Sequence, residues 1–490
     1  MDLSPDDILR RRATITLAHL RESQRQLVRD IQEQYNELGQ AVDNLRSYFA
    51  PDSDDEVGEF RPRSANAKPK REKSNRNKLN EESKTSRIIR PLSNRAPVLL
   101  REREYGFHKR KQNSQEFHQE NLPDYVSQQL PSVLQEKELN LGMMNKVFAS
   151  KWLNESQVVL GTKCNKLMVM DVRSNNLVHI QSLKSTSESK AAECPCGIHS
   201  IAINPSRTML ATGAQNTNDL AVYELPTFDP LCVGEQAHED WIFDMEWIDD
   251  EHLITGSRDS SLALWCIDNK GLSSETSGRP HMHGYRVIAP YSKELCSQAV
   301  RVRALTLGRN RGMMGVLSMN AKFHLWDIST FRQIESIDLP WKRENVCVAS
   351  SEDMGLFAIG SQAYVTLIDQ RLGGESKSRF LQIPAKHGER GIRSLSFNQN
   401  MITIGTGDGR VLFFDVKMFK FLYNQDGNCC ELQVGDGWLR NDSNYREHFI
   451  HGHYPNAIYT HCYDEWKARL FVAGGPLPAG LYGNYAGLFY

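Results

Sequence analysis

The chain has 490 residues, of which 40% are hydrophobic and 24% charged, and its 59 basic and 60 acidic residues leave a net charge of −1. This composition fits several globular domains or one large repeat array, and it excludes whole-chain disorder and fibrous proteins. No run approaches the roughly 18 uncharged residues of a membrane span, and the acidic start does not resemble a secretory signal, so we expect neither a membrane nor an exported protein.

The ten cysteines are scattered, and no Cys-x-x-Cys pair occurs. This usage argues against a disulfide scaffold and a paired zinc site. We therefore expect a protein of the reducing cytoplasm and nucleus without a metal cofactor.

Residues 1–50 predict a long helix. Ser4, Pro5 and two following aspartates are typical of a helix start. Apolar residues then alternate spacings of three and four, as on the seam of a coiled coil: Val28, Ile31, Tyr35, Leu38, Val42, Leu45 and Phe49. Self-association through residues 28–49 is one interpretation, and an amphipathic helix packed on the same chain is the other.

Two further segments precede the repeats. Residues 51–85 form a charged linker that cannot bury enough apolar surface to fold alone, and its Lys68-Pro-Lys-Arg71 run resembles a nuclear-import signal. Residues 86–138 carry short apolar patterns broken by prolines, which predict two short helices over 87–104 and 124–138.

From residue 139 to 490 the pattern changes to short strands that recur. Each unit has an apolar strand, a second strand ending near glycine, a tight polar turn, and a third strand ending in an aromatic or apolar residue. Clear units begin at Trp241, Val302 and Gly391, and weaker copies begin at Val147, Ile198, Val346 and Ile458. Seven units of about 40 to 45 residues predict an all-β fold, a seven-bladed WD-repeat β-propeller.

The last unit ends its third strand at Tyr490, so it lacks an outer strand. We expect residues 139–142 to supply that strand and close the ring, because closure removes exposed strand edges. Residues 269–298 form a long insertion, which we assign to the fourth unit without a role.

Two histidines match the pattern that braces a WD blade. His238 occurs with Asp259 and Trp265, and His387 occurs with Asp408. We interpret both histidines as structural.

Aligning the units predicts which residues surround the mouth of the central channel: Phe148, His199, Phe243, Arg303, Cys347, Arg393 and Tyr459. Lys146 and the turn residues Lys163 and Arg258 should lie on the same face. Five cations, Lys146, Lys163, Arg258, Arg303 and Arg393, would then converge, a set suited to carboxylates or phosphates. The alternative is that local acids neutralise them, such as Asp259 beside Arg258 and Glu389 near Arg393.

The sequence contains no P-loop, no His-Glu-x-x-His and no Gly-x-Ser-x-Gly motif, so we expect a non-catalytic protein. Two blade ends carry Ile368-Asp-Gln-Arg371 and Met170-Asp-Val-Arg173. Each arginine either binds a partner or simply caps its blade in solvent.

Several longer stretches resemble a known family. They are Leu130-Pro-Ser-Val-Leu134, Asn145-Lys-Val-Phe-Ala-Ser150, Gly161-Thr-Lys-Cys-Asn165, His238-Glu-Asp-Trp-Ile-Phe243, Arg343-Glu-Asn-Val-Cys347, Ala457-Ile-Tyr-Thr-His-Cys-Tyr463 and Val472-Ala-Gly-Gly-Pro-Leu-Pro478. These stretches look like factor twelve of the WD-repeat proteins associated with the damaged-DNA-binding adaptor and cullin four. The resemblance covers about residues 86–490 and does not include the N-terminal coiled-coil pattern.

The resemblance implies a substrate receptor of the cullin-four RING ubiquitin ligase that binds acidic, twin-glutamate C-termini. The motif-matched pocket cations are the five named above. Adaptor docking would use residues 86–138 and, through the Trp-Asp-x-Arg box, Arg371 and Arg173. The first residue of each box departs from the family pattern, being Ile368 or Met170.

Two other functions compete with this one. A nucleic-acid-binding propeller would use the same arginines together with Lys68-Pro-Lys-Arg71, but few aromatic residues interleave with that basic run. A pure scaffold would have no use for a positively charged mouth.

Overall fold

The computed structural model describes residues 127–186, 189, 196–267, 279–280, 284–369, 379–386, 390–424, 427–450 and 452–490. By its contacts the chain divides into two units, Met1–Asn94 and Arg95–Tyr490, and the described residues all lie in the second unit. The predicted N-terminal helix, its self-association through residues 28–49, the charged linker, Arg371 and His387 therefore lie outside the described residues.

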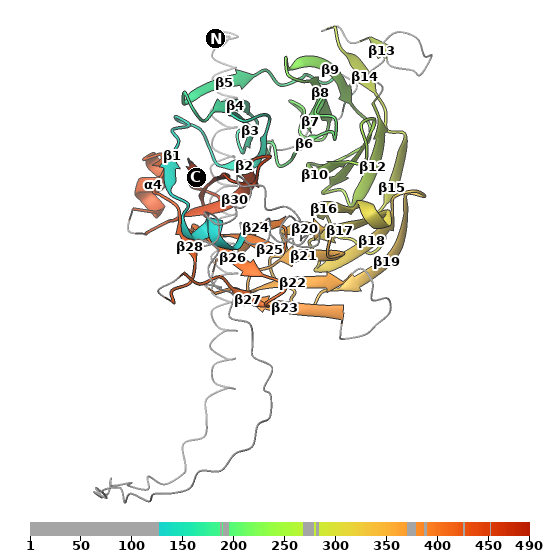
Figure 1. Cartoon of the computed structure of the whole chain (residues 1–490). Helices are drawn as coiled ribbons and strands as arrows, with labels where there is room; N and C mark the ends of the chain where they lie inside the picture. The colour runs from blue at the N-terminus through green and yellow to red at the C-terminus, as the bar shows by residue number, and fades with distance from the viewer. Residues whose placement is uncertain are drawn as a thin grey trace, which may run out of the picture. The chain divides into compact units, whose positions relative to one another are not determined.

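The described strands form seven sheets arranged around a central axis, which confirms the seven-bladed propeller (Figure 1). The first blade contains β2 (Val147–Trp152), β3 (Gln157–Thr162), β4 (Leu167–Asp171) and β5 (Asn176–Ile180). The second contains β6 (Ile201–Ile203), β7 (Met209–Gly213), β8 (Leu220–Glu224) and β9 (Asp229–Gly234). The third contains β10 (Ile242–Trp247), β11 (His252–Ser257), β12 (Ser261–Cys266) and β15 (Ser292–Leu295).

The remaining four blades follow the same antiparallel order. The fourth contains β16 (Val302–Gly308), β17 (Met313–Ser318), β18 (Lys322–Asp327) and β19 (Arg332–Asp338), with the 3-10 turn η3 (Arg309–Arg311) after β16. The fifth contains β20 (Cys347–Ser351), β21 (Leu356–Gly360), β22 (Tyr364–Asp369) and β23 (Phe380–Pro384). The sixth contains β24 (Ile392–Asn398), β25 (Met401–Thr406), β26 (Arg410–Asp415), β27 (Lys420–Phe421) and β28 (Glu431–Gln433). The seventh contains β30 (Asn456–Tyr463), β31 (Leu470–Pro476), β32 (Gly483–Phe489), β1 (Glu136–Glu138) and β29 (Trp438–Leu439).

The ring closes through β1, which pairs antiparallel with β32. The prediction that residues 139–142 form this strand was wrong. Leu139 and Leu141 are instead buried in the core between the seventh and first blades, and Gly142 has a left-handed φ of 69°. The second predicted helix, over 124–138, was also wrong beyond Ser132, because the 3-10 turn η2 (Leu130–Ser132) gives way to β1. Pairing with the open edge of β32 satisfies backbone groups that a helix there would leave exposed.

The insertion 269–298 lies within the third unit. Its assignment to the fourth unit from sequence was wrong. The insertion contains β13 (Arg279–Pro280) and β14 (Arg286–Ile288), which extend the sheet of the second blade, and β15, the outer strand of the third blade. β14 pairs in parallel with β9 of the second blade. The Tyr285 hydroxyl accepts a hydrogen bond from the Lys184 amide and donates one to the Lys184 carbonyl, both at 2.8 Å. The insertion therefore fastens the second and third blades together.

The brace around His238 is confirmed. Its Nε2 lies 2.7 Å from the Thr255 hydroxyl, its Nδ1 lies 3.0 Å from the Ser261 hydroxyl, and Trp265 donates to Thr255 at 2.9 Å. Asp259 completes the network at 3.5 Å from His238. Burial raises the pKa of Asp259, but the hydrogen bond and charge of His238 lower it overall. His238 is thus fully engaged in holding the third blade.

A belt of polar side chains joins neighbouring blades around the channel. The Ser150 and Thr460 hydroxyls lie 2.9 Å apart, Ser200 donates to Asp244 at 2.8 Å, and Thr306 donates to Ser350 at 3.0 Å. Large apolar clusters fill the space between adjacent sheets outside this belt, with Trp247, Trp265 and Trp326 fully buried. The blades are consequently fixed in register with one another, which positions the residues at each end of the channel.

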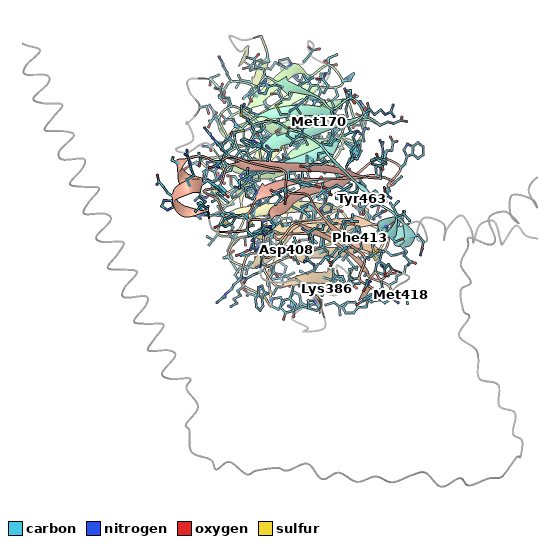
Figure 2. All side chains as sticks on the ribbon, turned by 90° about the vertical axis from the view of Figure 1, so that its left-hand side faces the viewer. Met170, Lys386, Asp408, Phe413, Met418 and Tyr463 are labelled. Atoms are coloured by element: carbon cyan, nitrogen blue, oxygen red, sulfur yellow. The ribbon has the colours of Figure 1, made fainter. Side chains whose placement is uncertain are left out.

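The propeller has two distinct faces. In Figure 2, Asp408 lies in the turn before β26 and Met418 in the turn after it, so they mark opposite faces of the ring. Because successive strands of a blade alternate in direction, the inner strands begin on the face of Asp408. The turns that carry Arg173 and Met418 belong to the other face.

Candidate functional site

A β-bulge presents the channel-facing residue on most of the inner strands. The register of five inner strands shifts at the mouth, where Phe148, Phe243, Arg303, Arg393 and Tyr459 have no regular partner. A bulge adds one residue and redirects its side chain. These five side chains, together with His199 and Cys347, line one central cavity of about 380 Å³. The structure therefore brings together all seven residues that the repeat alignment placed at the mouth.

One side of the mouth is aromatic. The rings of Tyr459 and Phe148 meet edge to face with centroids 5.2 Å apart, and Phe148 stacks on His199 at 4.7 Å. His199 in turn meets the edge of Phe243 at 4.9 Å. Burial and the charge of Arg303 lower the pKa of His199 to about 3, so its imidazole is neutral near pH 7. We call Tyr459, Phe148, His199 and Phe243 the aromatic arc.

The other side of the mouth is cationic. The guanidinium of Arg303 lies 4.9 Å from the centroid of the Phe243 ring, and burial lowers the pKa of Arg303. Among the described residues no carboxylate lies within ion-pairing distance of Arg303. Arg393 differs, because its guanidinium is 2.6 Å from Glu344 of the preceding blade. Arg303 is thus the mouth cation whose charge is least compensated.

The two lysines are not among the residues that line the cavity, and both bind the segment 477–481. Lys146 is 1% exposed and donates hydrogen bonds to the carbonyls of Pro478 and Leu481, at 2.9 and 2.5 Å. Lys163 donates to the Ala479 carbonyl at 2.8 Å. Burial, followed by the charge of Lys163, lowers the pKa of Lys146 to about 7. Sequence reasoning identified both lysines but not their carbonyl partners.

The segment that the lysines hold is bonded at every carbonyl from residue 477 to 481. Besides the three lysine contacts, Tyr459 donates to Leu477 at 3.3 Å, and Asn444 donates to Gly480 at 2.8 Å. Asn444 belongs to α4 (Ser443–His448), whose N-cap Asp442 accepts a hydrogen bond from the Tyr445 amide. This loop between β31 and β32, which contacts the mouth residue Tyr459, is therefore fixed by side chains from three separate parts of the chain.

Arg258 lies at the outer end of the aromatic arc. Its guanidinium is 4.5 Å from the Trp241 ring centroid and 3.6 Å from Asp240. The partner proposed from sequence, Asp259, is bonded to His238 instead. The partner proposed for Arg393, Glu389, lies outside the described residues, whereas Glu344 does pair with Arg393. The alternative of local neutralisation therefore holds for Arg258 and Arg393, with different acids.

Of the five cations only Arg303 and Arg393 line the cavity, and charge effects link the other three to its surroundings. The charges of Arg303, Lys163 and Arg258 all act to lower the pKa of the Cys196 thiol, although burial raises it overall to about 11. Arg303 and Arg393 both act on Cys347, and Lys163 acts on Lys146. Such a group can bind a ligand that carries several negative charges.

The comparison with protein families gives a match over most of the chain. The model described as "DDB1- and CUL4-associated factor 12 beta propeller" matches residues 130–490. The chain belongs to this family. Its match begins at η2, so the closing strand β1 is part of the factor 12 propeller.

Two carboxylates of this factor 12 propeller were missed from sequence. Asp244 and Glu246 line the channel beyond the mouth residues, and burial raises the pKa of both. Asp244 accepts hydrogen bonds from Ser200 and from the Leu305 amide, at 2.8 and 2.9 Å. Their alternation with the core residues Met245 and Trp247 along β10 is the signal that could have revealed them. The channel is thus positive at its mouth and carries acids farther inside.

Arg173 lies on the opposite face from the cavity. Its side chain is 67% exposed and its guanidinium is 3.5 Å from Glu155. Because it follows β4, it is separated from Lys163 by the length of that strand. Arg173 is accessible to a partner that binds this face.

The described part of the chain holds neither a metal-ligand cluster nor a helix of membrane-spanning type. Within it, no three His, Cys, Asp or Glu side chains are grouped as metal ligands. No helix there is both long and apolar enough to span a bilayer.

Proposed function

We propose that the chain is a substrate-recognition subunit of a cullin-four RING ubiquitin ligase and that its mouth binds acidic, twin-glutamate C-termini. The observation that carries this proposal is Arg303, a desolvated cation at the channel mouth with no carboxylate of the described residues in ion-pairing distance. A terminal carboxylate with two glutamate side chains brings about three negative charges to the surrounding cation group. Guanidinium groups bind carboxylates bidentately, which favours this ligand over a neutral chain end.

The family description supports association with the DDB1 adaptor and CUL4. We assign adaptor docking to residues 86–138, to Arg371 and to the face that carries Arg173. Because Arg173 and the mouth belong to opposite faces of the ring, one propeller can hold a substrate and an adaptor at once. The chemistry of ubiquitin transfer would belong to other subunits, and the chain itself requires no cofactor.

Two further assignments concern residues before the propeller. We place the protein in both cytoplasm and nucleus on the basis of the Lys68-Pro-Lys-Arg71 run. We assign self-association, where it occurs, to residues 28–49. Deleting residues 1–50 should then convert a dimer to a monomer in light scattering without changing peptide affinity. The same oligomeric state before and after the deletion would reject self-association through residues 28–49.

Reconstitution with the adaptor, the cullin and its RING partner tests the proposed function. The substrate is a reporter ending in Glu-Glu, and its control is the same reporter with Gly-Gly appended. We expect ubiquitination of the first reporter alone, and its loss on Arg303→Met. Arg332→Met is the matched control, since Arg332 is exposed on β19, outside the cavity.

Failure to co-purify with the adaptor would reject the ligase role. Equal ubiquitination of both reporters would reject C-terminal recognition. Binding of a nucleic acid with a steep salt dependence and no preference for acidic chain ends would favour the competing function.

A further inference from the structure

The mouth of the channel is divided into an aromatic half and a cationic half. The aromatic arc comes from the seventh, first, second and third blades in order. Arg303, Cys347 and Arg393 occupy the same level in the fourth, fifth and sixth blades. A ligand that enters the mouth therefore meets rings on one side and guanidinium groups on the other.

The aromatic arc offers an uncharged surface. Its consecutive ring centroids are 5.2, 4.7 and 4.9 Å apart, so the rings leave little polar surface between them. Neutral His199 adds no charge, and burial raises the pKa of Tyr459, which keeps its hydroxyl protonated. Such a surface binds methylene groups and not carboxylates.

The two halves meet where Arg303 stacks on Phe243. A stacked guanidinium keeps its N–H edge available for hydrogen bonds. A carboxylate bound to that edge carries its carbon stem along the neighbouring rings. Phe148 is at the centre of the arc, in contact with both Tyr459 and His199.

We propose that the aromatic arc packs against the methylene groups of the ligand's acidic side chains, so that the mouth selects glutamate over aspartate and Phe148 is a specificity-determining residue. This inference rests on the proposed function, because it assumes an acidic C-terminus in the mouth. Glutamate has one more methylene than aspartate. Burying one methylene changes affinity about fourfold, and burying one from each of two residues changes it roughly fifteenfold.

Peptide titrations on the full chain test the inference. Three fluorescent peptides with a common upstream sequence end in Glu-Glu, in Asp-Asp, and in Glu-Glu with an amidated terminus. The variants are Phe148→Ala and Phe148→Gln, the second of which fills the space while removing the apolar face. Phe148 is half-buried and outside the buried core, so both variants should fold, as thermal unfolding would verify. Trp466→Ala is the control, since Trp466 is 73% exposed in the turn between β30 and β31, on the opposite face.

The expected result is a roughly fifteenfold preference of the wild type for Glu-Glu over Asp-Asp, which falls toward equality in both Phe148 variants and persists in Trp466→Ala. Equal binding of Glu-Glu and Asp-Asp by the wild type, with weaker binding of the amide, would overturn the inference and leave the proposed function intact. Full retention of the preference in both Phe148 variants would overturn it as well. Absence of binding to all three peptides would reject the proposed function and this inference together.

Discussion

Replacing Arg303 by methionine should separate ligand binding from stability. Methionine keeps much of the length and apolar surface of the arginine stem but removes the guanidinium. In the free protein Arg303 is a desolvated cation: burial lowers its pKa, the charge of Asp244 acts in the opposite direction, and no ion pair is formed among the described residues. Its removal should therefore leave the free energy of unfolding unchanged or slightly raised.

The cost to binding is expected to be large. Truncating one partner of a buried, hydrogen-bonded charge pair costs about 2 to 5 kcal/mol, or roughly 30-fold to several thousandfold in Kd. Arg393 should matter less, because Glu344 already lies 2.6 Å from its guanidinium and a ligand must compete with that carboxylate. We expect Arg393→Met to weaken binding by only about 1 kcal/mol, within the range of a partly solvated pair.

Calorimetric titration of a Glu-Glu peptide into the wild type and both variants measures the difference, and urea unfolding measures stability in parallel. Arg332→Met is again the matched arginine control. Wild-type affinity in Arg303→Met would refute the reasoning. So would a loss of binding that is matched by a loss of stability, because the effect would then be structural.

Three other perturbations test separate parts of the structure. Burial and the charge of Lys163 lower the pKa of Lys146 to about 7, so Lys146 loses its charge as the pH rises through 7. The affinity for an acidic peptide should therefore fall between pH 6 and 8. In peptide titrations Lys146→Arg should flatten this pH dependence. In the unfolded chain Lys146 keeps its proton up to the ordinary lysine pKa of 10.5. The free energy of unfolding of the wild type relative to Lys146→Met should therefore rise with pH between about 7 and 10.5, and a fall in that window would contradict the assignment. His238→Ala leaves the hydroxyls of Thr255 and Ser261 and the carboxylate of Asp259 without their partner, and it should lower the free energy of unfolding in urea by about 2 to 3 kcal/mol. The control is His252→Ala at a half-exposed position, which should lower it by under about 0.5 kcal/mol. Ser394→Ala removes buried hydrogen bonds to Ile458 and His461 across the sixth and seventh blades and should cost about 1 to 2 kcal/mol; an unchanged unfolding midpoint would show that the polar belt contributes little.

The fold was predictable because its signals are local and repeated. The alternation of short strands and turns specifies a blade, and seven copies specify the ring. The His238 network was predictable for the same reason, since its five members lie within one blade and at fixed offsets. The placement of the seven mouth residues followed from aligning the units, although the bulges that aim them were not foreseen.

The features that sequence reasoning missed or misplaced depend on contacts between distant parts of the chain. Glu344 reaches Arg393 from the preceding blade, and no offset within a repeat reveals that pairing. The carbonyl partners of Lys146 are more than 300 positions away in sequence. The closing strand was misplaced by three residues, because the charged Glu136-Lys-Glu138 carries no apolar pattern whereas Leu139 and Leu141, which do, are buried in the core.

The insertion of the third blade was assigned to the wrong unit for a related reason. Its strand β14 follows β12 of the third blade in sequence but pairs in parallel with β9, so it extends the sheet of the preceding, second blade. The outer strand β15, near the end of the same segment, restores the regular pattern of the third blade.

The central claim, recognition of a charged chain end by the cation group at the mouth, is tested most directly by one pair of titrations. A peptide ending in Glu-Glu is measured as the free acid and as the terminal amide, against the full chain at the same ionic strength. Because the amide removes a carboxylate that pairs with desolvated cations, binding should weaken by about 2 kcal/mol, roughly thirtyfold. Equal affinities for the two peptides would contradict the account.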